Sequence, residues 1–178
     1  MKILTIALIV FFSYFLFTDL KRKIYAKQMQ NKLVELLNRR KYLSLENQLN
    51  ECEDKGYISK YNANFLRMNS AILQNDFSAL NHVLLIFDSM KLTNLQSCAV
   101  YSNIMIFALE KQNKELCKKA YSRIMLLKKN EELKDTATLV YRVCVLKDSL
   151  VKNEIQRRMA NASTEKKSFL LNSKSYFK

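Results

Sequence analysis

The sequence predicts an all-α protein in which an N-terminal transmembrane helix is followed by stacked helical hairpins. Three observations support this fold class. The 178 residues include one glycine, Gly56, and no proline, whereas the turns of β proteins need such residues at short intervals. Residues 3–17 carry no charge, and the polar corners behind them recur at nearly constant spacing. We expect a transmembrane anchor over 1–20, a helical-repeat domain over 21–160 and a basic flexible tail over 161–178.

The apolar run at the N-terminus is short for a membrane span. Fifteen helical residues rise about 22 Å against a hydrocarbon core of about 30 Å, so Lys2 and Lys21 would have to reach the two interfaces. A removable signal peptide is the alternative, but no cleavage site with small residues follows the run. Positive charge resists translocation, and a basic cluster comes next: Lys21, Arg22, Lys23 and Lys27. We therefore expect a retained single-pass anchor with the bulk of the chain in the cytoplasm.

The net charge of +14 is unevenly distributed. Residues 1–41 carry +7, residues 42–110 carry −3 and residues 111–178 carry +10. Basic ends around a mildly acidic middle suit a protein beside an anionic membrane surface, a nucleic acid or an acidic partner. The alternative is that the Lys and Arg side chains simply form the solvated faces of helices.

Apolar residues at helical spacing predict each helix in turn. The predicted helices are 24–40, 42–54, 59–74, 77–90, 94–112, 113–127, 131–147 and 149–159. Gly56 follows one helix where a positive φ is favoured, and the expected N-caps include Ser59, Thr93 or Asn94, and Asp148 or Ser149. Local signals of this kind place the ends of the helices.

Two apolar stripes are expected to face each other across neighbouring helix pairs. One comprises Phe77, Leu80, Leu84 and Phe87, and the other comprises Cys98, Tyr101, Met105 and Ala108. If these stripes pack together, neither pair is stable without its neighbour. The single histidine, His82, lies off the first stripe, so we expect it at the surface.

The corners inside the predicted hairpins recur along the chain. They are Lys41-Tyr42, Asp76-Phe77, Asn113-Lys114 and Asp148-Ser149, at intervals of 35, 37 and 35 residues. A helix pair recurring at this period is typical of an α-solenoid, although an ordinary helical bundle with evenly spaced corners is the alternative. Residues 71–80, AILQNDFSAL, resemble the hairpin turn of tetratricopeptide repeats, and residues 108–117 resemble it more faintly. This resemblance implies a tetratricopeptide-repeat-like solenoid with a concave face that binds a peptide or protein.

The sequence contains few residues suited to catalysis or to binding metals and cofactors. One glycine is too few for a glycine-rich phosphate loop, and one histidine gives little basis for a catalytic triad. No Cys-x-x-Cys motif is present. The four cysteines fall among apolar neighbours: Cys52, Cys98, Cys117 and Cys144. We expect them to be reduced core residues, although two disulfides are possible if the domain is exported. We expect no enzyme, no metal and no cofactor.

The predicted function is that of a membrane-anchored adaptor or scaffold that binds a protein or peptide at the cytoplasmic membrane face. Tyr101, Tyr121 and Tyr141 lie twenty residues apart and are the candidate partner-binding residues, although tyrosines also serve as core residues with an exposed hydroxyl. The alternative function is a basic peripheral module that binds anionic lipid or, with less support, nucleic acid. A polyanion binder would lose affinity steeply with added salt.

Overall fold

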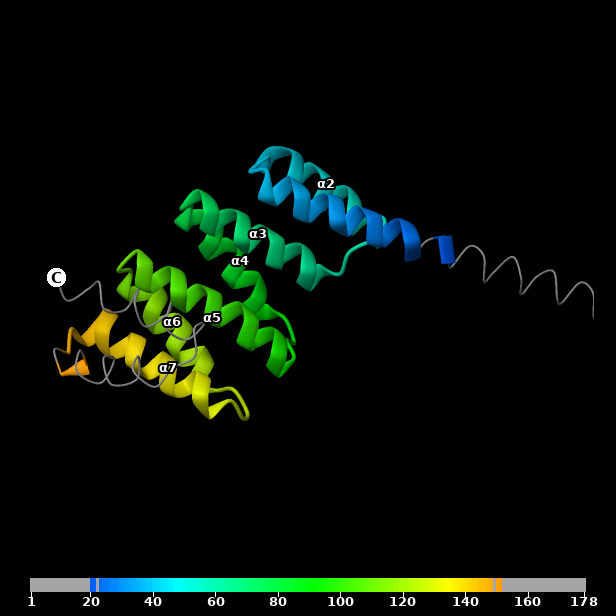
Figure 1. The fold of residues 1–178 in the computed structure, drawn as a ribbon. Helices are drawn as coiled ribbons and strands as arrows, with labels where there is room; N and C mark the ends of the chain where they lie inside the picture. Colours follow the sequence, from blue (N-terminus) through cyan, green and yellow to red (C-terminus); the bar gives the residue numbers. More distant parts are fainter. Residues whose placement is uncertain (1–19, 22, 149, 152–178) are drawn as a thin grey trace, which may run out of the picture. The chain divides into compact units, whose positions relative to one another are not determined.

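The computed structural model describes residues 20–21, 23–148 and 150–151 (Figure 1). The regular structure of these residues is entirely helical. A first helix covers residues 23–38 and is followed by α2 (Tyr42–Asp54), α3 (Lys60–Gln74), α4 (Phe77–Ser89), α5 (Asn94–Glu110), α6 (Lys114–Met125), α7 (Glu131–Tyr141) and the π-helical turn η1 (Arg142–Leu146). The chain divides into two compact units, which meet in sequence between Met90 and Lys91.

The predicted corners share one backbone arrangement. Each follows a residue with left-handed φ between 51° and 57°: Arg40, Asn75, Gln112 and Lys147. At the first three corners the next residue donates its N–H to the carbonyl five residues earlier, at 2.9 Å in each case (Lys41 to Leu36, Asp76 to Ala71, Asn113 to Ala108). This hydrogen bond closes the C-terminus of a helix in the Schellman motif. The even spacing in the sequence therefore corresponds to a repeated structural turn, and the packing is repeat-like.

Capping side chains begin the helices at most of the predicted positions. Ser59 accepts a hydrogen bond from the N–H of Asn62 at 3.2 Å, and Thr93 forms a capping box with Gln96. Asp76 and Asn113 are also N-caps, accepting from backbone N–H groups three residues later. Because each cap acts within one helical turn, these ends could be predicted from local sequence.

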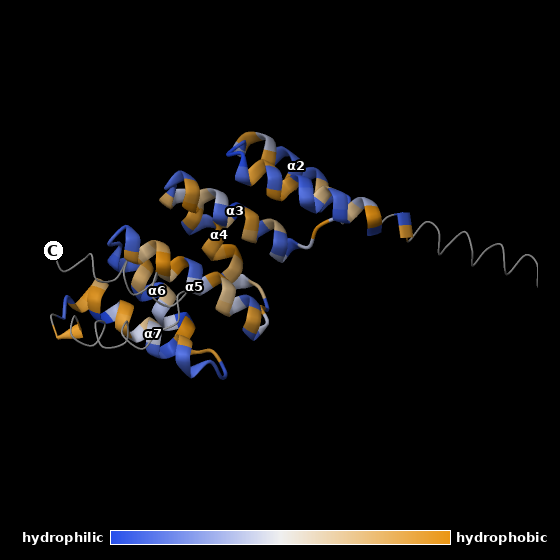
Figure 2. Cartoon of the chain, viewed as in Figure 1, coloured by the Kyte–Doolittle hydropathy of each residue, from blue (hydrophilic) through white to orange (hydrophobic). Residues whose placement is uncertain are grey.

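In the first unit, two hairpins bury their apolar stripes. Leu33, Leu45 and Leu49 are at most 1% exposed and form one core between the first helix and α2. Figure 2 shows hydrophobic and hydrophilic residues on different sides of these helices. Leu80, Leu84 and Phe87 are buried as predicted, whereas Phe77 is 37% exposed. Phe77 is the first residue of α4, and at that end the predicted stripe does not reach the core.

In the second unit, α5 is covered on several sides. Its buried residues are Val100, Tyr101, Ile104, Met105, Phe107, Ala108 and Leu109. The single predicted stripe is therefore too narrow, and Cys98 at its start is only half-buried. The four cysteines are free thiols, three of them buried.

The end of the second unit differs from the predicted continuous helix over 131–147. The α-helical pattern stops at Tyr141, and the π-helical turn follows. This turn ends with a hydrogen bond in which the N–H of Asp148 donates to the carbonyl of Arg142 at 3.1 Å. The Arg142 guanidinium also donates to the Asp148 carboxylate at 2.8 Å, so one residue pair holds both the backbone and the side chains of this corner.

The predicted fold class is wrong in its first element, the transmembrane helix. No helix in the described part of the chain is both long and apolar enough to cross a membrane. The helix over residues 23–38 buries Leu33 on one side and exposes Lys27 and Lys32 to solvent on the other, and a span cannot present such charges to lipid. Residues 3–17, on which the prediction rested, and the predicted tail over 161–178 lie outside the described residues. The cytoplasmic membrane location stays a prediction.

Candidate partner-binding cleft

A cleft of about 630 Å³ opens among α2, α3 and α4 in the first unit. Its apolar lining consists of Leu43, Ala71, Ala79, Val83 and Ile86. Leu43 is 78% exposed and supplies apolar surface that a partner could cover. We call this site the α2–α4 cleft.

The α3–α4 hairpin gives the α2–α4 cleft a fixed wall. The left-handed backbone of Asn75 and the hydrogen bond from the N–H of Asp76 to the carbonyl of Ala71 close α3. Asp76 then caps α4 by accepting from the N–H of Ala79 at 2.9 Å. This short connection holds α3 and α4 side by side.

Arg67 carries the main electrostatic network of the cleft. Its guanidinium lies 2.9 Å from the Glu46 carboxylate and 2.6 Å from that of Glu53, and it donates to Asn50 at 2.7 Å. Burial alone would lower the pKa of Arg67, but the hydrogen bonds to Glu53 and Glu46 outweigh it and raise that pKa. The guanidinium thus remains charged and ties α3 to α2.

Asn64 lies on the same wall and is 2% exposed. Its side-chain nitrogen donates to the carbonyl of Lys60 at 2.8 Å, whereas its Oδ1 has no partner. No other buried side-chain nitrogen or oxygen in the described residues lacks one. An unsatisfied buried acceptor costs about 1–3 kcal/mol, so this oxygen is an unusual feature of a folded chain.

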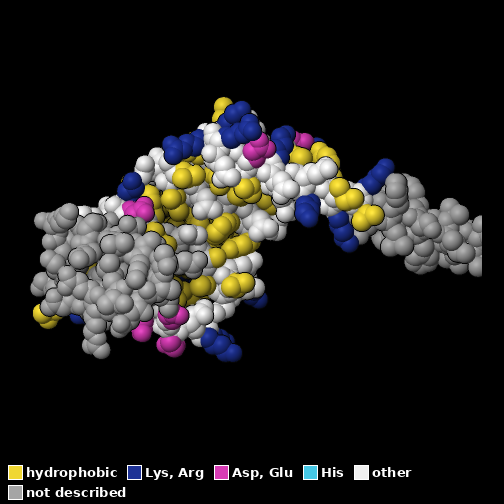
Figure 3. Space-filling model, in the orientation of Figure 1, with side chains coloured by type: hydrophobic (Ala, Val, Ile, Leu, Met, Phe, Trp, Pro, Cys, Tyr) yellow, Lys and Arg dark blue, Asp and Glu magenta, His cyan; other side chains and the backbone are white. Residues whose placement is uncertain are grey.

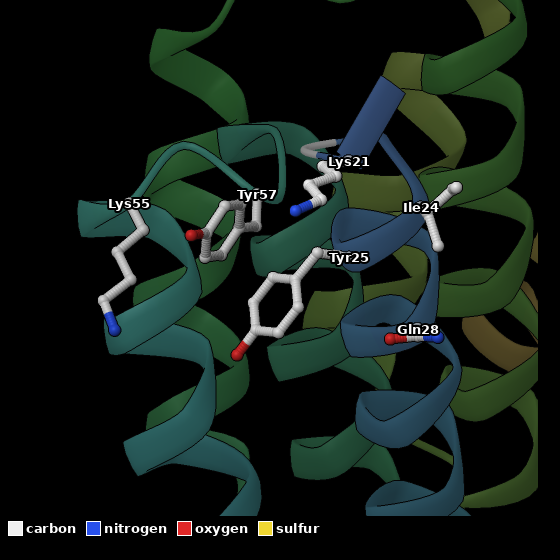
Figure 4. Close-up of a pocket in the computed structure, with 6 residues that line it drawn as sticks. All are labelled: Lys21, Ile24, Tyr25, Gln28, Lys55 and Tyr57. Carbon is white, nitrogen blue, oxygen red and sulfur yellow. The ribbon is translucent and has the colours of Figure 1, made fainter. Parts of the chain in front are cut away.

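A second, shallower cleft of about 480 Å³ lies beside the start of the first helix (Figure 4). Lys21 and Tyr25 face Tyr57, and the two tyrosine rings meet edge to face with centroids 5.0 Å apart. Lys55 also lines this cleft and is paired with Glu51 at 2.6 Å. The hydrogen bond to Glu51 is the main reason that the pKa of Lys55 is raised. Of the two lysines that line this cleft, Lys55 is therefore already neutralised by the carboxylate of Glu51.

The predicted basic cluster belongs partly to this second cleft. Lys21, Lys23 and Lys27 are exposed, and Arg22 lies outside the described residues. Figure 3 shows several Lys and Arg side chains around exposed hydrophobic ones where the described chain begins. A role in binding lipid stays a prediction.

The three predicted partner-binding tyrosines lie in different environments. Tyr101 is 4% exposed on α5, so it contributes to the core of the second unit. Tyr121 and Tyr141 lie on α6 and α7 and stack with ring centroids 4.4 Å apart. Whether the half-buried pair contacts a partner stays a prediction.

Sequence reasoning missed Asn64 and Arg67. A signal was present, because both lie among the apolar residues of the predicted helix 59–74 and Asn64 falls directly after the buried Ala63. A polar residue on an inward helix face requires a partner from another element, and that partner cannot be identified from the helix alone.

In the described part of the chain, no three His, Cys, Asp or Glu residues are grouped so that they could hold a metal ion. His82 is exposed, as predicted, at the edge of the α2–α4 cleft.

The comparisons with known proteins identify no relative. No family model, no curated protein and no solved structure matches the chain at a significant level.

Proposed function

We propose that the chain is a helical-repeat adaptor that binds a segment of another protein at the α2–α4 cleft. The observation that carries this proposal is the cleft itself, which combines exposed apolar surface with polar side chains on the same wall. Ligand sites are usually clefts of this kind, in which apolar lining is combined with a few polar groups.

The repeated corners give further support. Asn75-Asp76 lies at the turn of the segment that resembles a tetratricopeptide repeat, and the same closing hydrogen bond recurs at Lys41 and Asn113. Repeat proteins of this architecture expose extended surfaces on which partners dock. We infer that this chain is a degenerate member of that structural class and that partner binding is its main role.

A photo-crosslinking amino acid placed in the full chain tests the proposal. Leu43 and Leu85 are both exposed leucines, at 78% and 64%, but only Leu43 lines the α2–α4 cleft. In cells of the source organism we expect a discrete adduct from the position of Leu43 and none from that of Leu85. Capture of the same partner should be lost in Leu43→Glu and retained in Leu85→Glu. Equal capture by both variants would contradict the proposed site.

The second candidate function is the binding of a polyanion by the cluster of Lys21, Lys23 and Lys27, and the two tyrosines in the cleft of Figure 4 favour it. Retention of the chain by anionic vesicles should then fall steeply as salt is raised. If the chain is an adaptor, the capture of its partner should instead depend little on salt. Salt screens charges and has little effect on the burial of apolar surface.

A further inference from the structure

Two free cysteines of the second unit converge on one patch of α5. The Sγ of Cys117, on α6, lies 3.8 Å from the Sδ of Met105. The Sγ of Cys144, on η1, lies 3.8 Å from the carbonyl oxygen of Ala108. Met105 and Ala108 are three residues apart in α5, so they are neighbours on the surface of that helix. The two thiols also form a side-chain hydrogen bond with each other, which places their sulfur atoms side by side.

The elements that carry the two cysteines hold them in position. Cys117 lies in the first turn of α6, where its N–H donates to the carbonyl of Asn113 at 3.0 Å. Cys144 is the middle residue of η1, and the Arg142 guanidinium at the start of this turn lies 2.8 Å from the Asp148 carboxylate behind it. α6 and η1 pack against each other. The two thiols thus come from fixed elements that already lie side by side, as a disulfide requires.

The two thiols differ in how readily they ionise. The hydrogen bond with Cys144, together with burial, raises the pKa of Cys117. The same hydrogen bond lowers the pKa of Cys144 against the effect of burial, and the positive charge of Lys114 acts in the same direction. Cys144 is also 8% exposed, whereas Cys117 is 0% exposed. Because the thiolate is the reactive form of cysteine, Cys144 is the residue that a small oxidant meets first.

We propose that Cys117 and Cys144 are a redox-active pair, which a hydroperoxide converts into a disulfide between α6 and η1. The thiolate of Cys144 attacks the peroxide, the O–O bond breaks, and Cys144 becomes a sulfenic acid while the other oxygen leaves as hydroxide or alkoxide. The sulfur of Cys117 then attacks the sulfur of Cys144, the S–O bond breaks, and water leaves with the proton of Cys117. The pair of sulfurs is oxidised by the two electrons that reduce the peroxide.

This site is independent of the adaptor function. It lies wholly in the second unit, whereas the α2–α4 cleft lies in the first. Loss of partner binding at the cleft would leave the proposed chemistry of the cysteines unchanged.

Peptide mapping of the full-length chain tests the proposal. The reduced chain is exposed to a few equivalents of hydrogen peroxide, the remaining thiols are blocked with N-ethylmaleimide, and the chain is cleaved with trypsin. Each cysteine lies on its own tryptic peptide: Cys52 in 42–55, Cys98 in 92–111, Cys117 in 115–118 and Cys144 in 143–147. We expect peptides 115–118 and 143–147 to be joined as the main disulfide, and dithiothreitol should release them.

Cys98 provides an internal control in the same experiment. It is half-buried and therefore more accessible than the buried Cys117 and Cys144, so oxidation governed by exposure alone would reach it first. If Cys117 and Cys144 stay unlinked, whether they remain reduced or Cys98 is oxidised in their place, the proposal is overturned. A link that occurs only in covalent dimers on non-reducing gels also overturns it.

Variants of the chain assign the order of the two steps. Cys117→Ala removes the second thiol, so the sulfenic acid of Cys144 should persist and be trapped by dimedone. Cys144→Ala should leave Cys117 reduced at the same dose of peroxide, and Cys98→Ala should form the disulfide as the wild type does. Labelling of Cys117 in Cys144→Ala that is as fast as labelling of Cys144 in Cys117→Ala overturns the assigned order. If the alanine variants do not fold, the peptide map of the wild type still decides whether the pair is linked.

The melting temperature gives a second readout on the wild type. A disulfide between α6 and η1 constrains the unfolded chain, so oxidation should raise the melting temperature by several degrees. The same treatment should cause no rise in Cys117→Ala. A lower melting temperature in the oxidised wild type would mean that the link distorts the folded unit, and this result would overturn a pair arranged for disulfide formation.

Discussion

Arg67 illustrates how a single residue joins two helices of the first unit. Only 17% of its side chain is exposed, and its guanidinium contacts Glu46 and Glu53 of α2 from its position on α3. Removing one member of a partly buried charged network costs more than the network contributes as a whole, because the remaining charges stay without a partner. The network therefore fixes the position of α2 beside α3 as well as the charge of the cleft.

Arg67→Ala should lower the free energy of unfolding by about 1–3 kcal/mol, since two carboxylates lose their shared counter-charge. Arg67→Lys should lie between wild type and Arg67→Ala, because an ammonium cannot reproduce the guanidinium fork. Urea unfolding followed by circular dichroism measures both.

Arg39→Ala is the matched control for this prediction. Arg39 pairs with Glu35 at 2.7 Å, but the two side chains are 64% and 56% exposed. Its removal should change the free energy of unfolding by no more than about 0.5 kcal/mol. Equal losses from Arg67→Ala and Arg39→Ala would refute the importance of burial at Arg67.

At the scale of helices, the hairpin corners carry a conformational cost. Arg40, Asn75, Gln112 and Lys147 all have left-handed φ, which is strained for a residue with a β-carbon. The hydrogen bonds that close the helices stabilise the corners despite this strain. None of the four is glycine, although glycine adopts this conformation with least cost.

Gln112→Gly should therefore raise the free energy of unfolding by about 0.5–1 kcal/mol, because it relieves the left-handed strain. The residue has φ 51° and lies at the turn between α5 and α6. Lys118→Gly, at an exposed position within α6, should instead lower stability by about 1 kcal/mol. Thermal melts of the two variants give the comparison, and a loss of stability in both would disprove strain at the corner.

The sequence predicts helix ends better than it predicts helix faces. The caps at Ser59, Asp76 and Asn113 act on N–H groups three residues later, so a short window contains both partners. The burial of α5 could not be predicted from one stripe, because a helix covered on several sides has no single apolar face. Phe77 fits the periodicity of its helix but is its first residue and stays 37% exposed.

The candidate cleft was less predictable than the helices for a related reason. The burial of Asn64 beside the cleft depends on α2 and α4, and the sequence does not show that these helices lie around it. Tyr101, Tyr121 and Tyr141 belong to three different helices, so their equal separation along the chain does not by itself place them on one face.

At the scale of the whole molecule, stability depends on the buried stripes. Leu84 is fully buried on α4, whereas His82, two residues earlier, is exposed. Leu84→Ala should lower the free energy of unfolding by about 2–5 kcal/mol, because it leaves a cavity in the core of the first unit. His82→Ala should have little effect on the melting temperature measured by circular dichroism. Similar losses in the two variants would mean that α4 presents a different face to its core.

The Leu84→Ala variant also tests whether neighbouring helix pairs depend on each other, as the sequence period predicts. In a solenoid each pair completes the core of the next, so damage to one pair should lower the protection of its neighbour. Hydrogen exchange measured by mass spectrometry should then be faster in peptides from residues 91–110 as well as in those from residues 60–89. Unchanged exchange in residues 91–110 would show that the pairs unfold independently, and an ordinary helical bundle in two parts would then describe the chain better than a solenoid.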